Sequence, residues 1–185
     1  MGDERLSDGG AGQGGRQVRN GQDTGQIFDH HFVEYTYAGG TKLISQCRHM
    51  KGCWNNVGEV VHGTHGYAVV NRAEIYDHHH NLIWKSDATS GPGKGWQQQH
   101  HDLFDALRNG ESINQADYGA RSTLTAIMGR LATYSGKVIK LDDVLNSDIT
   151  LADFDALKSW DDIPPVLPEE NGLYPIPVPG KEAVV

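Results

Sequence analysis

The sequence predicts an α+β fold in which helices pack on one face of a mostly antiparallel, open sheet. Residues 28–85 contain short runs of alternating apolar and polar residues, separated by glycine and asparagine turns, which is typical of a strand meander. Residues 96–131 then change to the three-to-four-residue spacing of amphipathic helices. Because strands come first and helices afterwards, the order favours an α+β fold over an alternating α/β fold.

The strands are predicted from alternation that is bounded by turn residues. Glycine turns at residues 39–40 and 63–66 join two pairs of these strands as hairpins. The predicted strands in chain order are Phe28–Tyr37, Thr41–Arg48, Val57–His62, Tyr67–Val70, Ala73–Tyr76, Leu82–Lys85 and, after the helices, Lys137–Lys140.

Two helices follow from helical spacing and from their end signals. The first spans Trp96–Leu107 and ends at Asn109–Gly110, because glycine readily adopts the left-handed conformation that terminates helices. The second has Asn114 as its N-cap and runs to Gly136. Small residues line one face of the second helix, where close packing is expected: Ser122, Ala126, Gly129 and Thr133.

Composition divides the chain into three parts. Residues 1–26 are rich in glycine and polar residues and are predicted to be a disordered lead-in. Residues 27–162 form the folded α+β domain, which ends with a short helix capped by Thr150 and Asp153. Residues 163–185 are rich in proline, which predicts an extended tail over the surface.

Charge and hydropathy exclude several classes of function. The net charge is -8 and no run is dense in Lys and Arg, which argues against binding to nucleic acid. No stretch approaches the roughly 18 apolar residues of a membrane helix, so no membrane partner is expected. Met1–Gly15 lacks the apolar segment of a secretory signal, so the default expectation is a cytoplasmic location. Cys47 and Cys53 are too few for a disulfide scaffold, although their spacing is compatible with one bridge.

No motif for a cofactor, a metal or catalysis is complete. Gly10–Gly15 matches the G-x-G-x-x-G pattern, but its flanks do not predict the strand and helix that a dinucleotide loop needs. Gly91–Gly95 lacks the Ser or Thr that binds magnesium in a P-loop. The spacing of His62 and His65 does not fit a structural zinc site, and His78–His80 is predicted to be a solvated turn. We therefore predict no catalytic residue, no cofactor-binding residue and no metal ligand.

The irregular stretch between the second and third predicted strands is the best candidate for a binding site. Arg48, His49, Trp54 and Asn55 bring cationic, aromatic and amide groups together, as recognition of a polyhydroxylated or carboxylated molecule requires. The alternative is an ordinary wide loop that Trp54 pins to the core.

Other histidines are weaker candidates. The side chains of His30 and His31 are expected on opposite faces of one strand, so at most one of them lines a given pocket. His100 lies on the apolar stripe of the first helix and is predicted to be a hydrogen-bonded core residue.

Several segments resemble the C-terminal domain of the Gfo/Idh/MocA oxidoreductases, and they agree in order over roughly residues 14–180. The turn Gly63-Thr64-His65-Gly66 is similar to the family's strand-joining G-T-K-G element. The other segments that carry the resemblance are Phe28–Tyr35 and Leu145–Asp148, which resemble the bacterial branch, and His100–Glu111, Tyr118–Arg130 and Tyr134–Val138.

The resemblance implies a fold and a place in a larger enzyme. In this family an N-terminal Rossmann domain binds NAD or NADP, and the C-terminal α+β domain provides an open sheet that walls the substrate pocket and often forms the subunit interface. The substrates are sugars, inositols or their derivatives, which react by hydride transfer. This sequence has no nucleotide domain, no E-K-P motif and no Asp followed four residues later by His. The family's catalytic residues are therefore not carried over.

We expect a C-terminal substrate-binding and oligomerisation domain of an NAD(P)-dependent oxidoreductase, inactive as this chain alone. Its expected partners are a sugar-like small molecule and further copies of the chain, joined through the open sheet. NAD or NADP would be bound by polypeptide outside this sequence. The alternative is a stand-alone binding or assembly module that pairs with a separate cofactor-binding subunit. An adjacent upstream reading frame that encodes a Rossmann domain would discriminate between the two.

Overall fold

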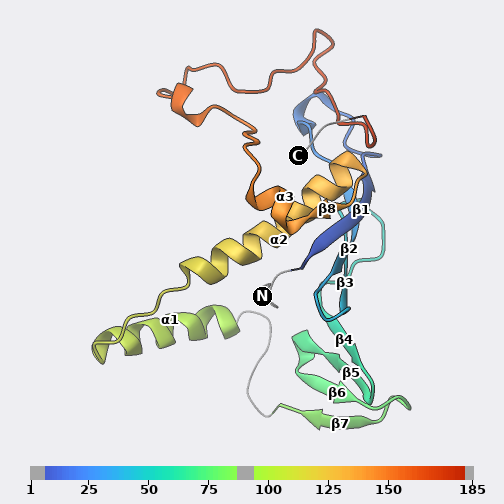
Figure 1. Cartoon of the computed structure of the whole chain (residues 1–185), viewed down its shortest axis with the longest axis vertical. Helices are drawn as coiled ribbons and strands as arrows, with labels where there is room; N and C mark the ends of the chain where they lie inside the picture. Colours follow the sequence, from blue (N-terminus) through green and yellow to red (C-terminus); the bar gives the residue numbers. More distant parts are fainter. Residues whose placement is uncertain (1–6, 87–93, 182–185) are drawn as a thin grey trace. The chain divides into compact units, whose positions relative to one another are not determined.

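The computed structural model describes residues 7–86 and 94–181 (Figure 1). The chain forms two compact units: unit 1 comprises residues 1–52 and 116–185, and unit 2 comprises residues 53–115. In the described residues, eight strands form two antiparallel four-stranded sheets, accompanied by three α-helices. The predicted α+β class with an antiparallel open sheet is confirmed, although the strands divide between two sheets.

The sheet of unit 1 has the strand order β3-β2-β1-β8. The hairpin of β2 (His30–Thr36) and β3 (Lys42–Arg48) was predicted, and Gly40 has a φ of 79° in its turn. On the other side of β2 lies β1 (Gly9–Gly15), which in turn pairs with the short β8 (Ile139–Lys140).

The glycine-rich segment is an inner strand of this sheet, which corrects its prediction as part of a disordered lead-in. Along β1, the glycines at positions 10, 12 and 14 face helix α2, as does Val33 opposite Gly12. A Cβ atom on Gly12 would lie 2.7 Å from Cγ2 of Thr133, so the helix packs directly on the strand backbone. The prediction failed because it assumed that a segment without large apolar side chains has nothing to pack.

Helix α2 (Ala116–Ser135) covers this glycine face. It begins two residues after the predicted cap, and its residues 128–135 are buried except for the half-buried Arg130, whereas its N-terminal half runs beyond the sheet (Figure 1). The predicted small-residue face is used at Gly129, against the ring of Tyr35, and at Thr133. The core groups around this contact are Val33, Tyr35 and Met128, and Leu131, Ala132 and Ile139.

Unit 2 contains the second sheet and one helix. The sheet is a meander of four strands, joined as predicted from the turns, and each of its ladders is antiparallel. Helix α1 extends slightly beyond the predicted helix, and His100 in it is exposed rather than part of a core. The elements are β4 (Val60–Gly63), β5 (Gly66–Val69), β6 (Glu74–Tyr76), β7 (Leu82–Lys85) and α1 (Lys94–Arg108).

The chain after β8 is mostly irregular. Helix α3 (Leu141–Leu145) follows β8 directly. The predicted last helix is only a three-residue 3₁₀ turn, Phe154–Ala156, capped by Asp153 and not by Thr150. The proline-rich residues 163–181 contain no helix or strand.

Two hydrogen bonds tie this proline-rich segment to other parts of unit 1. The side chain of Gln22 donates to the carbonyl of Asn171 at 3.3 Å, and the backbone N–H of Gly180 donates to the carbonyl of Ser135 at 2.6 Å. The segment therefore returns to the end of α2.

Candidate functional site

The structure divides the four predicted substrate contacts between the two units. Arg48 ends β3 and His49 follows it in unit 1, whereas Trp54 and Asn55 belong to unit 2. Arg48 lies opposite His30 and shares the sheet face that α2 leaves uncovered. Trp54 is 80% exposed, so it does not pin the loop to a core. That all four side chains meet in one pocket stays a prediction.

A buried carboxylate organises the end of the sheet where Arg48 and His49 lie. The Oδ2 atom of Asp29 accepts hydrogen bonds from the backbone N–H groups of Gln17 (2.8 Å), Val18 (2.7 Å) and Arg19 (3.1 Å). The backbone carbonyl of Asp29 accepts a hydrogen bond from the N–H of His49 at 2.9 Å. Asp29 therefore ties the chain after β1 and the chain after β3 to the start of β2.

The hydrogen bonds of Asp29 also keep its carboxylate ionised. Burial raises its pKa, but the N–H of Val18, the His30 ring at 2.8 Å and the N–H groups of Gln17 and Arg19 together hold the pKa well below its ordinary value of 3.8. Because both carboxylate oxygens are already hydrogen-bonded, Asp29 positions neighbouring groups and is not a candidate base.

Two arginines continue this arrangement. The guanidinium of Arg16 donates to the carbonyls of Gly25 (2.7 Å) and Arg19 and to Oγ1 of Thr24, so it fixes the loop. Nη2 of Arg19 lies 3.3 Å from Nδ1 of His49. The end of the sheet therefore presents Arg19 and the exposed His49 as neighbouring polar groups.

The opposite sheet face carries a second polar cluster, centred on His31. Nδ1 of His31 lies 3.0 Å from Oγ1 of Thr133 on α2, and its ring is stacked with that of Tyr134 at 6.0 Å between centroids. Burial lowers the pKa of His31, and the charges of His30 and Arg130 lower it further against the opposing effect of Asp29. His31 is therefore uncharged at neutral pH.

Arg130 belongs to the same cluster. Its guanidinium carbon lies 4.5 Å from the centroid of the Tyr134 ring, a cation–π contact. Phe28 stacks on the same ring at 4.1 Å, and the backbone N–H of Phe28 donates to the Tyr134 hydroxyl at 2.9 Å. These contacts join the chain just before β2 to α2, and His31 and Arg130 both lie against the Tyr134 ring.

Sequence reasoning missed this second cluster. The alternation along β2 did place His31 on the same face as Val33 and Tyr35, which was the available signal. The alternation could not identify Thr133 on α2 as the partner of His31, because the two residues are 102 positions apart in the chain.

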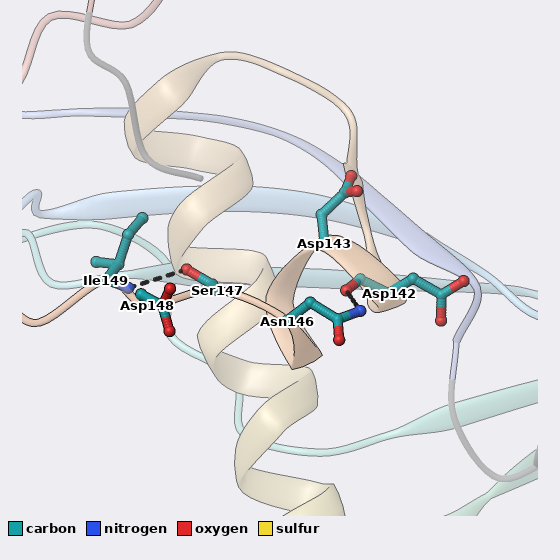
Figure 2. Close-up of a pocket in the computed structure, with 6 residues that line it drawn as sticks. All are labelled: Asp142, Asp143, Asn146, Ser147, Asp148 and Ile149. Atoms are coloured by element: carbon teal, nitrogen blue, oxygen red, sulfur yellow. Dashed lines mark hydrogen bonds between the residues drawn. The ribbon is translucent and has the colours of Figure 1, made fainter.

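A pocket lies beside α3 (Figure 2). It is open to solvent, and its lining includes three carboxylates. Two of its hydrogen bonds are local: Asn146 donates to the carbonyl of Asp142 at 2.8 Å, and the N–H of Ile149 donates to Oγ of Ser147 at 3.2 Å. The pocket residues are Asp142, Asp143, Asn146, Ser147, Asp148 and Ile149. The lining is mostly acidic, and its side-chain donors are the amide of Asn146 and the hydroxyl of Ser147, so the charge of this pocket disfavours an anion.

The remaining histidines do not converge. His78 contacts the carbonyl of Thr64 at 3.0 Å, whereas Nδ1 of His80 lies 3.0 Å from the hydroxyl of Tyr67. Within residues 7–86 and 94–181, no three His, Cys, Asp or Glu side chains are placed to hold a metal ion.

The cysteines and the second glycine-rich motif give no further site. Cys47 and Cys53 are both free and exposed thiols, so the bridge that their spacing allowed is not formed. Most of Gly91–Gly95 lies outside the described residues.

Comparison with models of known protein families and with curated proteins found no match to this chain. In the part of the chain that the structure describes, no helix combines the length and the apolar character needed to cross a bilayer.

Proposed function

We propose that this chain is the C-terminal substrate-binding and oligomerisation domain of an NAD(P)-dependent oxidoreductase that acts on sugars, inositols or related polyols. The observation that carries the proposal is the sheet of unit 1. Helix α2 covers one face of this sheet, and no described helix of unit 1 covers the other face, which carries Arg48 at the end of β3. The resemblance of the ordered segments to Gfo/Idh/MocA oxidoreductases supports the same function.

The G-x-G-x-x-G segment of this chain does not have the geometry of a dinucleotide-binding loop. The G-x-G-x-x-G match is an extended strand, and the face that would approach a phosphate is covered by α2. NAD or NADP would therefore be bound by polypeptide outside this sequence, and we expect the chain to be inactive alone. Its own contribution would be to bind and orient a substrate through hydrogen bonds at the end of the sheet.

The uncovered sheet face supports the oligomerisation part of the proposal. Phe32 and Ile44 are 42% and 54% exposed there, and Gln46 lies opposite Phe32 on the same face. A second copy of the chain would bury these apolar groups, whereas the polar groups would surround them, as in interfaces between subunits.

Sedimentation of matched variants tests this part. We expect the wild-type chain to self-associate and Ile44→Asp to be monomeric. Leu43→Asp is the control, because Leu43 is 43% exposed on the other face of the same strand. Equal association of all three proteins would contradict an interface through the uncovered face.

Titration tests substrate binding. We expect myo-inositol or D-glucose to shift NMR signals of residues near Arg48 and His49, and Arg48→Ala to weaken that binding. NAD and NADP should produce no shifts. Strong binding of either dinucleotide, or the absence of any response to polyols, would contradict the proposal.

A second candidate is a stand-alone module that pairs with a separate cofactor-binding subunit. The observation that favours it is the glycine-rich strand, because a segment built into the sheet cannot also serve as the phosphate loop of this chain. An upstream reading frame that encodes a Rossmann domain, whose product forms a complex with this chain, would favour this second function.

A further inference from the structure

We infer that His31 and Arg130 form a binding site for a hydroxylated carboxylate, such as a sugar acid. This inference goes beyond the proposed function, because it places a second ligand site on the sheet face that α2 covers, opposite the face of Arg48. It depends on three features of unit 1: the tautomer of His31, the contact of the Arg130 guanidinium with an aromatic ring, and the hydrogen bonds that already engage both oxygens of Asp29.

The hydrogen bonds around Thr133 determine the tautomer of His31. The Thr133 hydroxyl has one hydrogen and donates it to the carbonyl of Arg130 at 3.0 Å. The contact between Thr133 Oγ1 and Nδ1 of His31 must then have the imidazole N–H as its donor. Because Nδ1 carries the hydrogen, Nε2 of the neutral ring is an acceptor.

Arg130 supplies the positive charge. Arg130 is half-buried as a residue, and its guanidinium lies against the Tyr134 ring, which Phe28 stacks on. Among the side chains that the structure describes, no carboxylate forms an ion pair with Arg130. A guanidinium that is already held in place loses little side-chain entropy when it binds a carboxylate.

The nearest acid does not cancel this charge. Asp29 lies within electrostatic range of His31, but its oxygens are occupied by backbone N–H groups and by His30. The cluster therefore combines a cation with a neutral acceptor. A carboxylate matches the cation, and a hydroxyl hydrogen matches Nε2 of His31. A neutral sugar satisfies only the second contact.

Matched ligands provide the test. D-glucuronate and D-glucose differ at one carbon, which is a carboxylate in the first and a hydroxymethyl group in the second. In NMR titrations of the full chain, we expect glucuronate to bind at least about tenfold more tightly, because charge-assisted hydrogen bonds are the stronger ones. Raising the salt concentration should reduce this preference.

Three variants assign the effect to the site. Arg130→Ala should abolish the preference for glucuronate, and His31→Asn should weaken the binding of both sugars, because its amide can still donate to Thr133 but offers no acceptor at the position of Nε2. Arg121→Ala is the control on the same helix, because Arg121 already pairs with Asp117. Circular dichroism should show that each variant remains folded.

The outcomes separate this inference from the proposed function. If both sugars bind equally well, or if the preference survives in Arg130→Ala, the inference is wrong and the proposed function stands. If neither sugar nor inositol binds to the wild-type chain, both fail. A preference that disappears only in Arg130→Ala, and not in Arg121→Ala, supports the inference.

Discussion

Unit 1 and unit 2 both contain a four-stranded antiparallel sheet, but among the residues that the structure describes, a helix covers a sheet face only in unit 1. In unit 1, Val33 and Tyr35 are 4% and 5% exposed beneath α2. In unit 2, one residue from each strand forms a row of cross-strand neighbours, and the three large side chains of this row are 40–59% exposed. This row is Val61, Ala68, Ile75 and Trp84.

The comparison shows two ways to stabilise a small sheet. Helix burial removes whole apolar side chains from water, which contributes roughly 1.5–3 kcal/mol for each large residue. In unit 2, contacts between side chains on neighbouring strands take the place of helix burial. The rings of Tyr67 and Tyr76 are stacked with their centroids 5.2 Å apart, and each such pair contributes roughly 0.2–1 kcal/mol. We therefore expect the amides of β1 and β2 to exchange with solvent more slowly than those of β5 and β6.

The largest effect is expected at the contact between strand β1 and helix α2. Gly12→Val would place side-chain atoms where Cγ2 and the backbone nitrogen of Thr133 lie, and should destabilise unit 1 by about 3 kcal/mol. Urea unfolding followed by circular dichroism measures the loss, and hydrogen exchange locates it. Gly39→Ala is the control, because no atom lies within 4 Å of its added Cβ. If Gly12→Val made the amides of both units exchange equally faster, the contact between β1 and α2 would not be specific to the stability of unit 1.

A smaller effect is expected from the buried carboxylate of unit 1. Asp29→Ala leaves the N–H groups of Gln17, Val18 and Arg19 without their acceptor, which should cost about 2 kcal/mol. Thermal unfolding measures it. Asp143→Ala, an exposed carboxylate on α3, should change the stability by less than about 0.5 kcal/mol. If the two variants are equally stable, Asp29 does not hold this end of the sheet.

The stability of unit 1 should also fall with acid in two windows. The folded pKa of His31 lies below 6.5, so its contribution is complete above pH 6.5 and declines as the pH falls below that value. The pKa of Asp29 is also depressed, so its contribution declines below pH 3.8. Midpoints of thermal unfolding measured across this range should show both steps. In His31→Asn the first step should shrink, and an unchanged profile would contradict the buried, neutral His31.

The smallest effect is expected in unit 2. Glu74 contacts Lys85 at 2.9 Å, Arg72 at 3.4 Å and the hydroxyl of Tyr76 at 2.8 Å, but both cationic side chains are mostly exposed. Glu74→Gln should therefore destabilise the protein less than Asp29→Ala, and high salt should reduce the difference from wild type. A larger loss of stability in Glu74→Gln than in Asp29→Ala would contradict the expectation that the buried carboxylate of unit 1 contributes more than the exposed ion pairs of unit 2.

Elements that carry their own local signals were predictable from the sequence. The hairpin of β2 and β3 and the meander of unit 2 follow from alternation and glycine turns, and α2 follows from its periodicity and small-residue face. Strand β1 was not predictable in this way, because its partners are the helix backbone and two other strands, and glycine adds nothing to a hydrophobic pattern.

The candidate sites also differ in how far they could be predicted from local sequence signals. Arg48 and His49 are neighbours in the chain, so their position at the end of the sheet was within reach of sequence reasoning. The contact of His31 with Thr133 depends on how α2 crosses β2, and no local pattern encodes that geometry. The alternative for Trp54, an anchor that pins the loop to a core, is wrong because its side chain is exposed, and its role as a substrate contact stays a prediction.

The inner position of strand β1 has a practical consequence for recombinant work. Trimming the gene by composition would remove the first 26 codons, and with them the strand that links β2 to β8 and supports α2. The product would retain every large hydrophobic residue of the core but would lack β1, the strand against which α2 packs. A fusion tag therefore belongs ahead of Ser7, which is itself fully buried, with a spacer between them.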